Sequence, residues 1–139
     1  MRVFSVTAAS LLLAACASVQ PIEPRTAPAS VSFSGAAEQR VELSNFDFVP
    51  HEIRLHAGRP YELVLVNAAS GGHDFAAPEF FAAALVRAAD AELVAAGKVE
   101  VPGGETRTVH LVPHAGTYDL LCTHAGHALL GMKGSIVVE

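Results

Sequence analysis

Apolar and polar residues alternate along much of the chain beyond residue 38, as in β-strands that bury one face. Residues 61–66 instead form an almost continuous apolar run, as expected of a well-buried strand. The alternating stretches are residues 41–44, 52–56, 98–101, 108–112, 118–122 and 136–138. Turns containing glycine and proline separate these stretches. Several short strands at regular spacing predict an all-β domain, either a β-sandwich or a Greek-key barrel.

A stretch rich in alanine and leucine, residues 78–96, interrupts the strand pattern. Pro78 suits the first position of a helix and Gly97 suits its end, and apolar residues between them recur at helical spacing. We therefore expect one inserted α-helix at about residues 78–96. Phe80 and Phe81 require burial, which favours packing of this helix on the flank of the sandwich over a role in binding a partner.

The first residues of the chain have the pattern of an export signal. Arg2 is followed by an apolar run, residues 3–15, that is too short to span a bilayer, which takes about 20 residues. The run ends in Leu13-Ala14-Ala15-Cys16, which resembles a bacterial lipobox. The resemblance implies that residues 1–16 are a lipoprotein signal segment and that Cys16 is the lipidated residue of an exported, membrane-anchored protein facing the periplasm. An ordinary signal peptide with an incidental Cys16 is the alternative.

Residues 17–37 contain three prolines among small and polar residues and have no periodicity. This composition predicts a flexible tether that precedes a domain at residues 38–139. An edge strand within the tether is conceivable only near residues 31–33. The formal net charge of −5 and the absence of a basic stripe argue against a nucleic-acid partner.

The chain has two cysteines, so a lipidated Cys16 leaves Cys122 without a partner within the chain. An unpaired thiol in an oxidising compartment is a liability unless something occupies it, and a metal would do so. Cys122 opens the spacing Cys122-x4-His127-x4-Met132, and a second histidine, His73, follows two glycines upstream. Two imidazoles, one thiolate and a weak axial thioether form the ligand set of blue-copper sites.

Each of these four residues alone has a plainer interpretation. Met132 could fill the core, Cys122 could be an inert buried thiol, and His73 could be an ordinary loop residue. The metal hypothesis is favoured because one chain would need all of these coincidences together. An empty sandwich that serves as an adhesive module would require the four residues to be accidental.

From about Asn45 to Glu139, apart from the helical stretch, the chain resembles the cupredoxins, the family of plastocyanin and pseudoazurin. The resemblance lies in the ligand order and in the Gly-x-Tyr-x-Leu-x-Cys lead-in at residues 116–122. It implies a cupredoxin-like Greek-key β-sandwich, here with one inserted α-helix, that binds one Cu(I)/Cu(II) ion. By the family pattern His73 is the isolated ligand, and Cys122, His127 and Met132 are the loop ligands.

Two residues depart from the family pattern. Asp74 stands where the family often has asparagine; it is expected to tie the ligand loops together by accepting backbone N–H bonds and to lower the reduction potential. His124 stands where the family usually has an apolar residue, and it could replace His127 as a ligand or bind a second ion. His127 is favoured because it keeps the family spacing. His56 and His110 alternate with apolar strand residues and are expected to face outward.

A buried thiolate-ligated copper has no open coordination position for a substrate, whereas catalytic metal sites keep one. The His-Cys-His triplet that the resemblance leads one to expect in multicopper oxidases is missing, because Leu121 and Thr123 flank Cys122. We therefore expect no enzyme but a carrier in one-electron transfer, with the edge of His127 as the exit path to redox protein partners. The alternative is periplasmic copper storage, delivery or tolerance, with copper-handling proteins as partners.

Overall fold

The structure is a computed structural model that describes residues 19–139. The predicted signal segment, residues 1–16 with Cys16, lies outside the described residues. Within residues 19–139, no helix is both long enough and apolar enough to cross a membrane.

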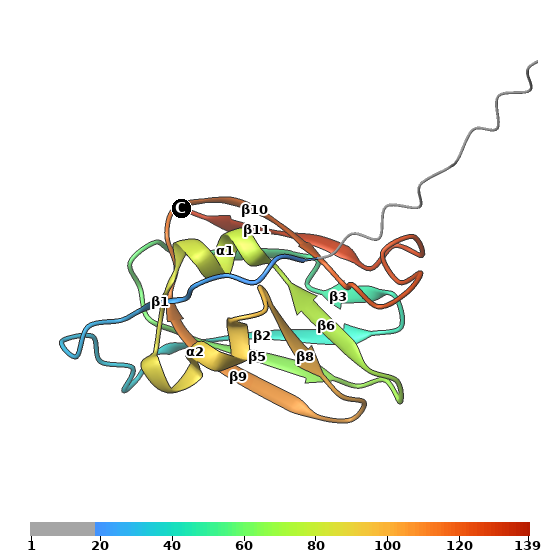
Figure 1. Cartoon of the computed structure of the whole chain (residues 1–139), viewed down its shortest axis with the longest axis horizontal. Coiled ribbons are helices and arrows are strands. Elements are labelled where there is room, and N and C mark those ends of the chain that lie inside the picture. Colours follow the sequence, from blue (N-terminus) through green and yellow to red (C-terminus); the bar gives the residue numbers. More distant parts are fainter. Residues whose placement is uncertain (1–18) are drawn as a thin grey trace, which may run out of the picture.

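Over these residues the strands form two mixed sheets that lie face to face (Figure 1). The six-stranded sheet has the order β1 (Arg25–Thr26), β7 (Leu85–Val86), β9 (Thr106–Val112), β5 (Tyr61–Asn67), β2 (Ala37–Ser44) and β3 (Asp47–Val49). The five-stranded sheet has the order β4 (Glu52–Leu55), β11 (Lys133–Val138), β10 (Gly116–Leu121), β6 (His73–Ala76) and β8 (Lys98–Val101). Each sheet contains one long parallel pair, β2 with β5 and β4 with β11. The predicted all-β sandwich is confirmed.

The alternation in the sequence corresponds to the buried and solvent-facing sides of each strand. Along β5 every second residue is buried, and the same period holds for the buried ends of β2 and β9. Four phenylalanines fill the space between the sheets and under the insert, namely Phe48, Phe75, Phe80 and Phe81, each at most 1% exposed. Phe48 of one sheet meets Phe75 of the other edge to face, with ring centroids 5.9 Å apart. Burying such side chains supplies roughly 1.5 to 3 kcal/mol each, and it fixes the two sheets against one another.

The predicted helical insert is present, but it is not one continuous helix. It consists of α1 (Pro78–Ala83), the strand β7, a 3₁₀ turn η1 (Ala88–Asp90) and α2 (Ala91–Val94). Pro78 starts it and Gly97, with φ of +73°, follows its end as predicted. The backbone at Ala84 is extended because the next two residues, Leu85 and Val86, pair with β9. This pairing satisfies backbone groups at the edge of β9 that a continuous helix would leave open.

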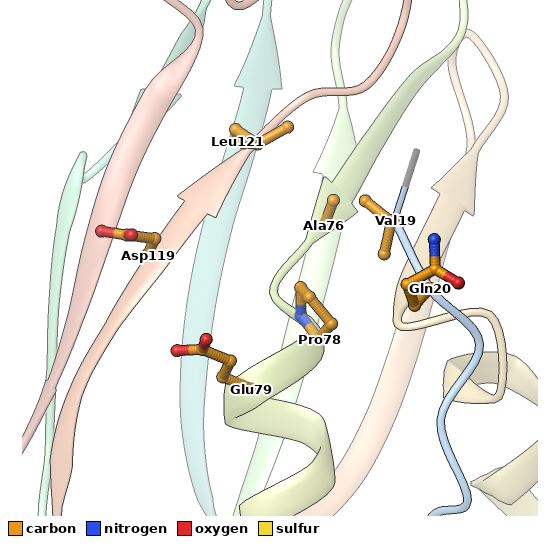
Figure 2. A pocket seen from close by; sticks show the side chains of 7 residues that line it. All are labelled: Val19, Gln20, Ala76, Pro78, Glu79, Asp119 and Leu121. Carbon is orange, nitrogen blue, oxygen red and sulfur yellow. The ribbon is translucent and has the colours of Figure 1, made fainter. Parts of the chain in front are cut away.

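The first described residues differ from the expectation of a free tether. Residues 19–27, here called the N-terminal strap, run along the insert. The Ile22 N–H donates to the Ala95 carbonyl (2.9 Å), β1 pairs in parallel with β7, and the Ala27 N–H donates to the Val86 carbonyl (2.8 Å). At the start of the strap, Val19 lines an open, mainly apolar pocket beside Leu121 (Figure 2). The strap therefore joins the domain close to the end of β10.

His110 is a correction to the sequence analysis. Alternation does place it on the outer face of β9, but the insert covers that face, and its side chain is only 14% exposed. Asp90 Oδ2 accepts the His110 backbone N–H and lies 2.9 Å from His110 Nδ1, while Arg87 donates two hydrogen bonds to the same carboxylate. On its other side, His110 Nε2 lies 3.3 Å from a Glu62 oxygen. His56 is exposed, as predicted.

Candidate metal centre

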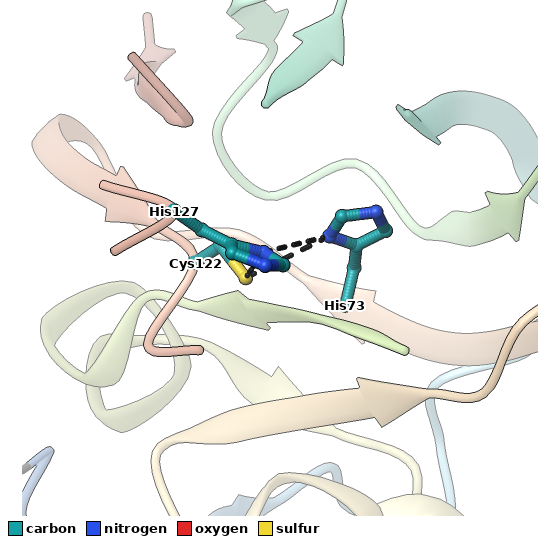
Figure 3. Close-up of side chains that lie close together, drawn as sticks. All are labelled: His73, Cys122 and His127. Carbon is teal, nitrogen blue, oxygen red and sulfur yellow. Dashed lines mark hydrogen bonds between the residues drawn. The ribbon is translucent and has the colours of Figure 1, made fainter. Parts of the chain in front are cut away.

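Three of the four predicted ligands meet at one end of the sandwich. His73 is the first residue of β6, Cys122 directly follows β10, and His127 lies in the loop between β10 and β11. Their side chains point toward one another (Figure 3). His73 Nδ1 lies 3.1 Å from His127 Nδ1 and 4.0 Å from Cys122 Sγ, and Cys122 Sγ lies 3.5 Å from His127 Nδ1.

The spacing of these donor atoms fits a metal ion. The point equidistant from the three atoms lies about 2.1 Å from each, close to the roughly 2.0 to 2.3 Å that a first-row metal keeps to imidazole nitrogen and thiolate sulfur. A thiolate with two imidazoles in a trigonal arrangement suits copper in both of its common oxidation states. The donor set is therefore matched to copper in atom type and in separation.

Burial adjusts the protonation of the donors. Burial, with the nearby imidazoles of His127 and His124, lowers the pKa of His73, which favours the neutral ring that a metal requires. Burial also raises the pKa of the Cys122 thiol, so that thiol must lose its proton when a metal binds. His73 Nε2 is buried and has no hydrogen-bond partner among residues 19–139, so Nδ1 is the nitrogen that faces the other donors.

Met132, the predicted axial ligand, is fully buried, and its backbone closes the loop. Its N–H donates to the His127 carbonyl (3.0 Å), and its carbonyl accepts the Cys122 N–H (3.1 Å). These two bonds place Met132 beside both loop donors. Its thioether as the fourth ligand remains a prediction.

Asp74 joins the two ligand segments, as the sequence analysis expected. Its carboxylate accepts the Thr123 backbone N–H (2.7 Å) and the Thr123 hydroxyl, and its own backbone N–H points to Cys122 Sγ at 3.5 Å. Asp74 is fully buried. One side chain thus fixes the residue after Cys122 relative to the residue after His73.

Lys98 is a site residue that the sequence analysis missed. Its ammonium donates to Asp74 Oδ2 (2.7 Å) and to the Thr123 hydroxyl (2.8 Å). Burial opposes its charge, but Asp74 and Glu100 outweigh that effect and raise the pKa of Lys98. Lys98 therefore offsets the negative charge from which a lowered reduction potential was expected. A single lysine on an alternating strand gives no signal of this role in the sequence.

His124 is held outside the three-donor group. Its Nε2 lies 2.6 Å from a Glu100 oxygen, and its ring stacks against His127 with centroids 5.4 Å apart. Asp74, Glu100 and His124 also lie close enough together to hold an ion. The Lys98 ammonium, however, already lies 2.7 Å from Asp74 and 3.9 Å from Glu100. This cation disfavours a second metal there.

Exposed apolar residues lie near the partly exposed His127. Leu129 is 91% exposed and Leu130 is 62% exposed, and the Leu130 N–H donates to the His127 carbonyl (3.1 Å). Phe46, which the sequence analysis did not select, also contacts His127: the rings meet edge to face with centroids 5.1 Å apart. Phe46 comes from the turn between β2 and β3, far from the ligand loop in sequence, so no local motif marks it.

Comparisons with known proteins agree with this fold and with copper binding. Residues 36–139 match the family described as "Copper binding proteins, plastocyanin/azurin family". None of the curated proteins compared with the chain matches it.

Three solved structures share the fold at low sequence identity. Dithionite-reduced auracyanin from the photosynthetic bacterium Roseiflexus castenholzii is 19% identical, with a TM-score of 0.56 over 75% of this chain and 98% of that chain. Auracyanin B is also 19% identical, with a TM-score of 0.56 over 87% and 99% of the two chains. The McoA multicopper oxidase from the hyperthermophile Aquifex aeolicus is 18% identical, with a TM-score of 0.61 over 83% of this chain but 31% of the oxidase.

Sandwich, donor set and family match together define a small copper protein. The chain belongs to the copper-binding proteins of the plastocyanin/azurin family, the cupredoxins. Its cofactor is one copper ion, as the sequence predicted.

Proposed function

We propose that this protein is a one-electron carrier whose copper ion is held by His73, Cys122, His127 and Met132. The observation that carries the proposal is the close approach of two Nδ1 atoms and one Sγ around a point at metal-bonding distance. Copper bound there supplies a reversible one-electron couple between Cu(I) and Cu(II). The remaining features of the site concern how the protein holds these donors and exposes one of them.

The protein fixes the donors before a metal arrives. Hydrogen bonds between the backbones of Cys122, His127 and Met132 close the loop, and Asp74 ties the loop to β6. Donors held in this way change position little when the charge of the ion changes, which keeps the reorganisation that accompanies electron transfer small. A delivery protein would instead need donors that open readily.

His127 provides the exit path for the electron. Among the four proposed ligands, it is the one that is partly exposed, while the other three are buried. The exposed Leu129 and Leu130 follow His127 in the same loop and offer a small apolar surface. Such a surface suits the brief, low-area contacts of redox protein partners.

We further propose that the protein is not an enzyme. The multicopper oxidase that shares its fold is covered over only 31% of its length, so the likeness concerns one part of that enzyme. Leu121 and Thr123, rather than histidines, flank Cys122. Cys122 therefore lacks the two adjacent imidazoles through which electrons would pass from the site to further copper ions.

Export and anchoring through a lipidated Cys16 complete the proposal and place the carrier on the periplasmic side of a membrane. Because Val19 lies against the domain, the three residue steps from Cys16 allow a reach of at most about 10 Å, shorter than that of a free tether. Fractionation of cells that express the full chain or Cys16→Ala tests the anchor. Recovery of both proteins in the same fraction would contradict it.

Addition of Cu(II) to the purified protein tests the copper site. We expect an intense blue colour that Cys122→Ser abolishes and that His124→Ala preserves, because His124 lies outside the donor group. Reversible voltammetry with copper retained in both states would support electron transfer. Rapid loss of copper on reduction would favour the alternative of storage or delivery, and a wild-type protein that binds no copper would contradict both.

A further inference from the structure

The turn between β2 and β3 holds a bulky residue in an unfavourable backbone conformation. Ser44 pairs with Asp47, so Asn45 and Phe46 form a two-residue turn. Phe46 has φ of +72°, and it is the only residue other than glycine with positive φ among residues 19–139. Glycine or asparagine usually occupies such turn positions, because a Cβ atom is strained there.

Packing in the core does not account for Phe46, because 37% of the residue is exposed. Its specific contact is with the proposed copper ligand His127, whose ring it meets at 80° with centroids 5.1 Å apart. This edge-to-face geometry is the favourable arrangement of two aromatic rings. The strained residue therefore touches the one proposed ligand that is partly exposed.

His127 lies in a segment without regular strand or helix structure, between Gly126 and Gly131, which both have positive φ. Backbone hydrogen bonds fix its main chain, and three neighbouring rings contact its imidazole: that of His73, another proposed ligand, with centroids 4.9 Å apart, and those of His124 and Phe46. His124 stacks on it at an interplanar angle of 28°, and Phe46 meets it edge on. His124 is in turn held by Glu100, whereas Phe46 is held by its turn.

We propose that Phe46 is a positioning residue for His127: its strained turn places an aromatic ring against the imidazole and thereby slows release of copper from the exposed side of the site. The inference rests on the proposed role of His127 as a ligand. Removal of the ring frees the imidazole to rotate away from the metal. Removal of the Cβ also relieves the backbone strain, so stability and copper retention change independently.

The test uses Phe46→Gly, Phe46→Leu and Phe46→Tyr, with Val49→Ala as the control. Val49 is an exposed apolar residue of the same hairpin, at 53% exposure. Transfer of Cu(I) to a chelator is expected to be roughly 2- to 10-fold faster in Phe46→Gly and Phe46→Leu, the range that one aromatic contact accounts for. Phe46→Tyr, which keeps the ring, and Val49→Ala should match the wild type. Phe46→Gly should unfold at the same or a higher denaturant concentration than the wild type.

A second measurement does not depend on copper. In the metal-free protein, NMR signals of the His127 ring should move toward those of a free imidazole in Phe46→Gly and Phe46→Leu but not in Phe46→Tyr. Unchanged ring signals and transfer rates in Phe46→Gly and Phe46→Leu would overturn the proposal. Equal acceleration in Val49→Ala would overturn it as well, since the hairpin as a whole would then be responsible. A wild-type protein that binds no copper would defeat the proposed function, and the ring signals would still decide whether Phe46 positions His127.

Discussion

The two ends of the sandwich solve different problems with different side chains. At the copper end, in red in Figure 1, the loop between β10 and β11 exposes Leu129 and Leu130 while it buries the sulfur of Cys122. The insert, near α2, leaves less apolar surface in water, with Leu93 39% exposed, and buries the carboxylate of Asp90, which is 5% exposed. Apolar surface left in water serves contact with another molecule, whereas a buried, paired charge serves the fold itself.

One device nevertheless recurs at both ends. Asp74 accepts a backbone N–H from Thr123 and pairs with Lys98, and Asp90 accepts a backbone N–H from His110 and pairs with Arg87. Each carboxylate fastens one segment to another. The two carboxylates hold different segments: Asp74 holds the segments that carry the proposed metal donors, and Asp90 holds the insert against β9. Substitutions should therefore separate copper chemistry from stability.

Asp90→Asn should have the largest effect on stability. The amide keeps the size of the carboxylate but loses its charge toward Arg87 and its ability to accept from both His110 and Arg87. We expect the free energy of unfolding to fall by about 2 to 3 kcal/mol, somewhat less than for a fully buried pair because Arg87 is partly exposed. Denaturant titration measures this loss. The blue absorption of the copper form should stay unchanged, and a changed spectrum would contradict the separation of the two ends.

The same pair predicts a pH dependence. Burial opposes ionisation of Asp90, but the hydrogen bonds from Arg87 and His110 outweigh it, so the pKa of Asp90 is lowered. A carboxyl whose pKa is lower in the folded state stabilises the fold above its unfolded pKa, about 4 for aspartate, and this stabilisation is lost as the pH falls through the folded value. The difference in unfolding free energy between wild type and Asp90→Asn should be largest near neutral pH and should shrink in acid. A difference that grew in acid would contradict this assignment.

Asp74→Asn should have a somewhat smaller effect on stability and a clear effect on copper. We expect a loss of about 2 kcal/mol from the Lys98 pair, because an amide oxygen still accepts the Thr123 N–H and Lys98 keeps the Thr123 hydroxyl and the nearby Glu100 carboxylate. The substitution removes one negative charge near the metal while Lys98 stays positive, so the reduction potential should rise. Voltammetry checks the direction, with Asp90→Asn as the control that should leave the potential unaltered. A lower potential in Asp74→Asn would contradict this expected effect of the charges of Asp74 and Lys98 on the copper ion.

Much of this architecture could be predicted from local patterns in the sequence. Alternation identified most of the longer strands because each buries one face in a common core. The proposed ligands His73, Cys122 and His127 could be selected because thiolate and imidazole at that spacing suit few purposes other than metal binding. Asp74 could be assigned because the cupredoxins often have asparagine at its place after His73, and an aspartate there can also accept backbone N–H bonds.

What could not be predicted depends on contacts between distant segments. β1 and β7 have two residues each, too few for any periodicity, and they form because β9 offers an open edge. His110 alternates like a surface residue, and only the folded insert covers it. Phe46 contacts the His127 ring, which lies far from it in the sequence, so no local motif predicts the contact. The N-terminal strap was expected to be a flexible tether because its contacts are likewise with segments distant in the sequence.

Substitution of one exposed leucine at each end, Leu129 or Leu93, should have the smallest effect on stability. Leu129→Ser at the copper end and Leu93→Ser in α2, where Leu93 is 39% exposed, should each change the free energy of unfolding by less than about 0.5 kcal/mol. Their effects on electron exchange should differ. Leu129 belongs to the apolar surface near His127, so its loss should slow exchange between Cu(I) and Cu(II) copies by a few fold, and Leu93→Ser should leave that rate unchanged. NMR line broadening in mixtures of the two oxidation states measures the rate. Equal slowing by both substitutions would mean that exchange does not proceed through the copper end, and that the exposed leucines there serve some other contact.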